Sequence, residues 1–126
     1  MLVTNHQTID GETDIISEQG TGSFREADGK WYIMYKTGDI SVMLKIDGET
    51  VHVKRSGEYG SDIDYVKGEK TAFSYNTPYG RMDMALYTKD IKYTMSVFGG
   101  VVVLEYDLYA GAGTIENKME IKIVAI

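Results

Sequence analysis

The sequence predicts an all-β protein, built as a single antiparallel up-and-down β-barrel of about eight to ten strands. Turn-forming residues rich in glycine recur along the chain, several of them about ten residues apart, which is the spacing of consecutive β-hairpins. Between the turns, apolar and polar residues alternate as they do in a strand with one buried face. The turn signals are Asp10-Gly11, Asp28-Gly29, Thr37-Gly38-Asp39, Asp47-Gly48, Lys67-Gly68, Thr77-Pro78-Tyr79-Gly80, Gly99-Gly100 and Gly111-Ala112-Gly113.

The alternation locates the apolar strand faces in chain order. They are Val42/Leu44/Ile46, Val51/Val53, Ile63/Tyr65, Met82/Met84/Leu86, Ile91/Tyr93/Met95/Val97, Val102/Leu104/Tyr106/Leu108 and Met119/Ile121/Ile123. The segment 99–109 starts apolar on both faces, which predicts a central or covered strand. Sequential hairpins form a meander, and a meander avoids open edges by closing into a barrel. We expect one domain over residues 1–126.

Composition narrows the classes of function. The chain has no cysteine, so disulfides, thiolate nucleophiles and cysteine metal sites are excluded, and it has only two histidines. We therefore expect no metal and no cofactor. The net charge is −6 and, apart from the Lys54-Arg55 pair, the basic residues are scattered singly along the sequence, which argues against a nucleic-acid partner. The chain lacks a signal-like start and a long apolar run, so we predict a cytoplasmic protein without membrane insertion.

The segment YNTPYG, residues 75–80, holds the only proline of the chain. Pro78 cannot donate a ladder hydrogen bond, and Gly80 permits a positive φ where the next strand begins. The segment therefore predicts a tight corner between two strands, with Tyr75 and Tyr79 as contacts at the rim of a ligand site.

The same segment carries a family resemblance. YNTPYG, followed by MDMALYT, GG, LEYDLY and ENKMEIKI, resembles the YwiB-like family of small bacterial proteins of unassigned function. The resemblance extends upstream through WYIMY (31–35), LKI (44–46) and KRSG (54–57). It implies a calycin or lipocalin-type β-barrel and no known activity. One departure is that Lys36 and Thr37 follow Tyr35, where the family has a carboxylate.

No catalytic constellation is visible, and an enzyme is the least favoured class. His52 lies between Val51 and Val53, so it points away from their apolar face as a lone histidine. The carboxylate pairs Asp62/Asp64 and Glu105/Asp107 lie opposite apolar faces, which predicts solvated residues. Nucleophile-elbow and phosphate-loop motifs do not occur.

Polar residues that share a face with apolar ones are the candidate ligand contacts. Strict alternation places Arg55 on the same face as Val51 and Val53. A guanidinium buried there needs a carboxylate or phosphate partner. The alternative is that Arg55 lies at the end of its strand and reaches water. Asn117 lies on the face of Met119, and its amide finds either backbone partners or a ligand. The inward tyrosines are Tyr35, Tyr93 and Tyr106.

Two functions fit these observations. In the first, the barrel binds a small, partly apolar or amphipathic ligand in its interior or at its mouth, oriented by Arg55 and the tyrosines. In the alternative, the barrel is filled and acts through its outer surface as a homodimer or interaction module. The apolar residues that would then be exposed are Val101, Val103, Val124 and Ile126.

Overall fold

The computed structural model describes residues 2–9, 15–57, 60–110 and 113–125, and it contains ten strands. The strands are β1 (Leu2–Ile9), β2 (Ile15–Ala27), β3 (Lys30–Thr37), β4 (Ile40–Asp47), β5 (Thr50–Ser56), β6 (Ser61–Val66), β7 (Lys70–Thr77), β8 (Gly80–Ser96), β9 (Gly99–Ala110) and β10 (Gly113–Val124). Within these ranges no helix is long and apolar enough to cross a membrane.

The strands form a closed barrel in sequential order. Each strand pairs antiparallel with the next, and β1 also pairs with β10. The predicted all-β, up-and-down barrel is therefore confirmed, with the strand number at the upper end of the expected range. The closing strand, β1, has no clear alternation in the sequence and was not among the predicted strands.

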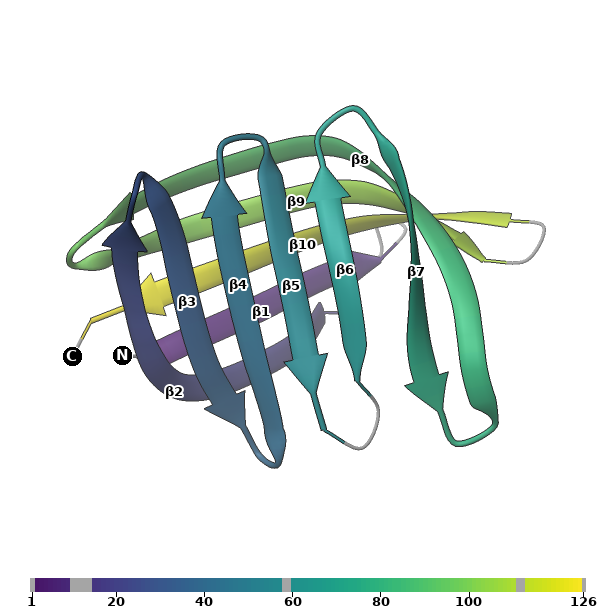
Figure 1. Cartoon of the computed structure of the whole chain (residues 1–126), viewed down its shortest axis with the longest axis horizontal. Coiled ribbons are helices and arrows are strands. Elements are labelled where there is room, and N and C mark those ends of the chain that lie inside the picture. Colours follow the sequence, from purple (N-terminus) through teal and green to yellow (C-terminus); the bar gives the residue numbers. More distant parts are fainter. Residues whose placement is uncertain (1, 10–14, 58–59, 111–112, 126) are drawn as a thin grey trace.

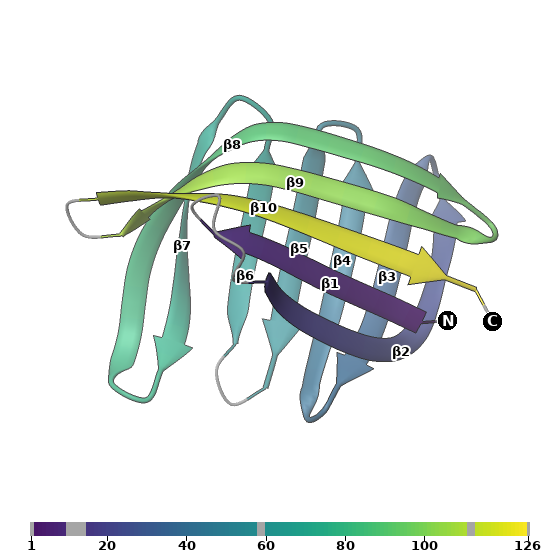
Figure 2. The same cartoon turned by 180° about the vertical axis from the view of Figure 1, so that it is seen from behind.

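The barrel consists of two layers whose strands cross at a steep angle. In Figure 1, β3 to β6 run upright in front, while β1, β8, β9 and β10 run across behind them. Figure 2 shows the same crossing from the other side. Two long strands take part in both layers. Residues 15–21 of β2 pair with β1 and residues 21–27 with β3, while β8 pairs first with β7 and then with β9. This is the orthogonal arrangement in which bent strands form the corners.

The core fills the space between the layers, and it follows the predicted alternation. Fully buried side chains come from both sides, including Ile33, Leu44 and Val51 in front and Leu104 and Ile121 behind. One of the predicted apolar strand faces extended too far along the chain. Val97 was predicted to continue the apolar face of Ile91, but β8 ends at Ser96, and Val97 lies in the following turn with 76% of its surface exposed.

The β7–β8 turn has the geometry predicted for YNTPYG. Pro78 and Tyr79 connect the two strands, Thr77 pairs with Gly80, and Gly80 has a φ of 115°. This positive φ is accessible to glycine and strained for a β-branched residue. The turn signals at Asp10-Gly11 and Gly111-Ala112 lie outside the described residues.

We expect Gly80→Val to lower the free energy of unfolding by about 1 kcal/mol or more. An added Cβ at Gly80 would have no neighbour within 4 Å, so backbone strain alone would cause the loss. Urea denaturation gives the midpoint, and Asn76→Val, at an exposed strand position of the same hairpin, is the control. Equal midpoints for Gly80→Val and the wild type would contradict a strained corner.

Candidate functional site

Four of the predicted ligand residues lie on inward-facing strand positions and are at least half-buried. Tyr35, Tyr106 and Asn117 are buried, and Arg55 is half-buried. Tyr35 and Arg55 both pair with Val42 across β3, β4 and β5, while Tyr106 pairs with Asn117 across β9 and β10. The four residues therefore form two groups, one on each layer of the barrel. The Asn117 amide nitrogen donates to the Ile115 carbonyl oxygen at 3.1 Å, which is the backbone partner expected for a buried amide.

Two further polar residues join the rear group. Tyr65 on β6 packs edge-on against Tyr106, with ring centroids 5.1 Å apart. Thr88 on β8 pairs with Tyr106 and is completely buried, and its hydroxyl oxygen has no hydrogen-bond partner within the described part of the chain. The sequence already placed Tyr65 on the apolar face of Ile63, though not as a ligand contact, and parity with Leu86 likewise carries Thr88 inward.

The environment of Tyr65 is strongly apolar. Burial raises the pKa of Tyr65 well above its ordinary value of 10.0, and the charge and hydrogen bond of Tyr106 raise it further. The positive charge of Arg55 opposes this shift, so the guanidinium lies within electrostatic reach of the Tyr65 ring. Tyr65 thus connects the Arg55 group of the front layer with the Tyr106 group of the rear layer.

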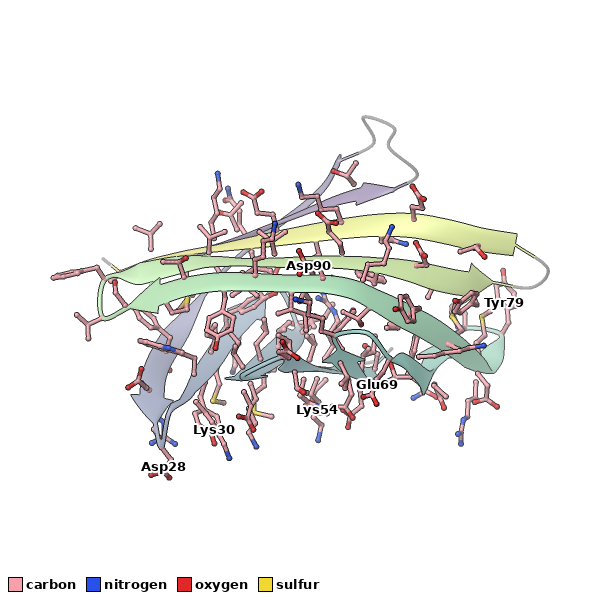
Figure 3. All side chains as sticks on the ribbon, turned by 90° about the horizontal axis from the view of Figure 1, so that it is seen from above. Asp28, Lys30, Lys54, Glu69, Tyr79 and Asp90 are labelled. Atoms are coloured by element: carbon pink, nitrogen blue, oxygen red, sulfur yellow. The ribbon has the colours of Figure 1, made fainter. Side chains whose placement is uncertain are left out.

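The other three predicted tyrosines are not part of this interior cluster. Tyr79 lies at the tip of the β7–β8 turn with 99% of its surface exposed (Figure 3). Tyr93 occupies an inward strand position opposite Val102, yet 38% of its surface is exposed. Tyr75 pairs through its backbone with Ser61 and Met82, and its side chain lies outside the described part of the structure.

A cavity of about 560 Å³ opens at one end of the barrel, and none of the predicted ligand residues lines it. Its apolar wall is formed by Phe24 and Trp31, whose ring centroids are 6.2 Å apart. The lining residues are Gly22, Ser23, Phe24, Arg25, Glu26, Trp31, Val97 and Ala125. The Ala125 amide donates to the Phe98 carbonyl at 3.2 Å, which ties the chain after β10 to the β8–β9 turn at this opening. We call this cavity the mouth.

The outer face holds a cluster of one histidine and two aspartates that corrects one expectation. His52 points away from the face of Val51 and Val53, as predicted, but the prediction that it has no partner was wrong. Its Nε2 lies 2.6 Å from an Asp62 oxygen, and its Nδ1 lies 2.5 Å from an Asp64 oxygen. Both aspartates are exposed, as predicted, but each binds the histidine across the β5–β6 ladder. Since both ring nitrogens are engaged, neither is left to act as a base or metal ligand.

Comparison with known proteins supports the fold. A family model described as a domain of unknown function, DUF1934, matches residues 1–123. Among solved structures, the crystal structure of the ywiB protein from Bacillus subtilis matches with a TM-score of 0.79 and 23% sequence identity, over 96% of this chain and 86% of that chain. No curated protein matches the chain. The structural match confirms the predicted barrel fold.

Proposed function

Because the chain belongs to the DUF1934 family, whose function is unknown, and forms a YwiB-like barrel with an apolar mouth, we propose that it binds a small, partly apolar molecule there. The family membership confirms the resemblance seen in the sequence. The single observation that supports binding is the mouth itself, which is lined by the Phe24 and Trp31 rings and by Val97.

The dimensions and lining of the mouth indicate the class of ligand. A volume of about 560 Å³ lies in the range of small-molecule pockets, which bury most of the ligand surface against apolar and aromatic side chains. The apolar part of the ligand would pack on Phe24 and Trp31. Arg25 and Glu26, both exposed, supply polar contacts at the rim. The ligand is therefore amphipathic, with its apolar part inside.

The interior polar residues are the second part of the proposal. Gly22 lines the mouth and pairs with Tyr35, so a ligand that reaches past Phe24 would meet the Tyr35 side of the interior first. In this proposal Tyr35, Arg55, Tyr106 and Asn117 orient the polar end of a longer ligand. Tyr93 lies on β8, the strand that leads to Val97, but it does not line the mouth. Tyr79 does not line the mouth, and no role is proposed for it there.

Trp31 allows a direct test, because it is the only tryptophan of the chain. We would titrate the protein with N-phenyl-1-naphthylamine, a neutral apolar fluorophore that accepts energy from tryptophan. Saturable energy transfer from Trp31 is expected. Trp31→Phe should remove the energy transfer. Binding to this variant can still be measured from the emission of the fluorophore when the fluorophore is excited directly. Val97→Lys, which places a charge on the apolar lip, should weaken binding about tenfold.

Val124→Lys is the matched control, since Val124 is also exposed but does not line the mouth. It should bind the fluorophore as the wild type does. Arg55→Ala separates binding at the mouth from contacts with the interior polar residues. The apolar fluorophore needs only the mouth, so its affinity for this variant should equal its affinity for the wild type. Absence of saturable transfer, or equal weakening by Val97→Lys and Val124→Lys, would overturn binding at the mouth.

One observation favours the alternative, a barrel that acts through its surface. Phe98, with 81% of its surface exposed, lies beside exposed Val97 and Val124 at the same end of the barrel. Clustered exposed apolar residues often mark an interface. Native mass spectrometry of gently purified protein separates the two functions. A retained mass of small-molecule size supports the ligand, whereas a bare dimer supports association through this apolar end.

A further inference from the structure

The outer face of β2 to β5 carries an unusual concentration of positive charge for a chain of net charge −6. Of the thirteen basic residues, five point outward from these four strands. They are Arg25, Lys30, Lys36, Lys45 and Lys54. Among the outward positions that the structure describes on these strands, Asp47 is the one acidic residue, and it pairs with Lys30 at 3.8 Å. We call this surface the basic face; Figure 3 shows Lys30 and Lys54 on it.

An apolar groove crosses the basic face. It has a volume of about 420 Å³, and its apolar side chains are Met34, 54% exposed, and Met43, half-buried. Met34 and Met43 pair directly across β3 and β4, and Lys54 is the next residue along the same row. Lys36 lies one row away and also lines the groove. An adaptable methionine floor is thus bordered by two ammonium groups.

The charges around the groove differ in how they are compensated. Arg25 and Lys45 lie over the Tyr32 ring, at 5.5 and 6.0 Å from its centroid. Lys36 and Lys54 have no ion-pair partner among the described residues. The neighbour of Lys54 across the β5–β6 ladder is Asp62, whose carboxylate is engaged by His52. Asp62 contacts His52 rather than Lys54, so the Lys54 ammonium has no ion-pair partner among the described residues.

We propose that the basic face docks an acidic peptide segment of a partner protein, with an apolar side chain of that segment seated on Met34 and Met43. Carboxylates on either side of this anchor would bind Lys36 and Lys54. Charge complementarity argues for this occupant, and an apolar anchor surrounded by polar contacts is the usual layout of a binding hot spot. Asp62 and Asp64 limit the basic face on the β6 side, where they would repel a longer acidic segment.

Fluorescence anisotropy with a labelled peptide Glu-Glu-Leu-Glu-Glu tests the proposal. Binding to the wild type is expected at low salt and should weaken as salt rises. The double variant Lys36→Glu/Lys54→Glu should lose at least about tenfold in affinity. Lys92→Glu/Lys118→Glu is the matched control, since it makes the same charge change at exposed positions of β8 and β10. This control should change the affinity less than about twofold.

The apolar anchor is tested separately. Replacing the leucine of the peptide by serine should weaken binding to the wild type, and Met43→Ser should remove this difference between the two peptides. Equal losses in the two charge-reversal variants would overturn the proposal, because net charge alone would then explain binding. Indifference to the leucine would overturn the groove as the anchor site. A single-stranded oligothymidylate that binds more tightly than the peptide, through the same lysines, would assign the face to nucleic acid instead.

Discussion

Gly22→Val is expected to destabilise the barrel by more than about 3 kcal/mol, or to prevent folding altogether. A Cβ at Gly22 would lie 1.8 Å from the Met34 carbonyl oxygen and 2.6 Å from the Tyr35 Cα. Both are backbone atoms of the paired strand, so no change of rotamer can relieve the clash. Gly22 follows the residue at which β2 turns from β1 to β3, and barrel corners of this kind favour glycine. Urea denaturation followed by Trp31 fluorescence measures the loss.

Ser23→Val is the control for Gly22→Val. Ser23 is the next residue of β2, it is exposed, and a β-branched side chain suits an extended strand. We expect its stability to change by no more than about 0.5 kcal/mol. Similar losses for the two variants would show that the strand as a whole resists substitution and that close approach at Gly22 is not the cause.

The same corner shows why part of the fold could not be predicted from the sequence. Turn signals and alternation identify β4, β5 and β8 to β10, because hairpins are local. Closure depends on β1, which pairs with both β2 and β10, and β1 lacks a regular alternation because Asn5 and Gln7 follow Val3 at positions of the same parity. The need for glycine at positions 20 and 22 likewise becomes visible only in the folded barrel, where backbone carbonyls of β3 lie too close for a Cβ.

Strand parity was informative for single residues of the candidate site. It placed Tyr35, Tyr106 and Asn117 in the interior, where the structure has them buried. The mouth was missed because its walls come from distant segments: Phe24 and Trp31 meet across one hairpin, whereas Val97 arrives from the β8–β9 turn. Parity gives the direction of a side chain, but not which sheet edges enclose a cavity.

The basic face was missed for a related reason. Its basic residues are far apart in the sequence, and apart from Lys54, which is followed by Arg55, each stands alone, so the sequence shows no cluster on these strands. Pairing of β3 with β4 and β5 sets them in adjacent rows, which brings charges about ten residues apart into one surface. The net charge can therefore be counted from the sequence, but the surface on which the basic side chains gather cannot be predicted from it.

The stability of the barrel is expected to fall steeply above pH 10 because of Tyr65. Its pKa is raised in the folded protein by burial and by Tyr106, so the folded state holds the phenol proton more tightly than the unfolded chain does. The stabilisation is fully present below the unfolded value of 10.0 and is lost as the pH rises from there toward the folded pKa. The expected slope is about 1.4 kcal/mol per pH unit.

Tyr65→Phe isolates this contribution, because phenylalanine has no proton to lose. At pH 8 the variant should be less stable than the wild type by about 1 kcal/mol, since it loses the hydrogen bond with Tyr106. Between pH 10 and 11 the difference should shrink, because only the wild type loses the stabilisation from Tyr65. Urea denaturation at pH 8, 10 and 11 measures both effects, and Tyr79→Phe, at a fully exposed position, should follow the wild type. Parallel curves for Tyr65→Phe and the wild type would mean that the Tyr65 hydroxyl is in contact with water, and that the interior is open to solvent between the two layers.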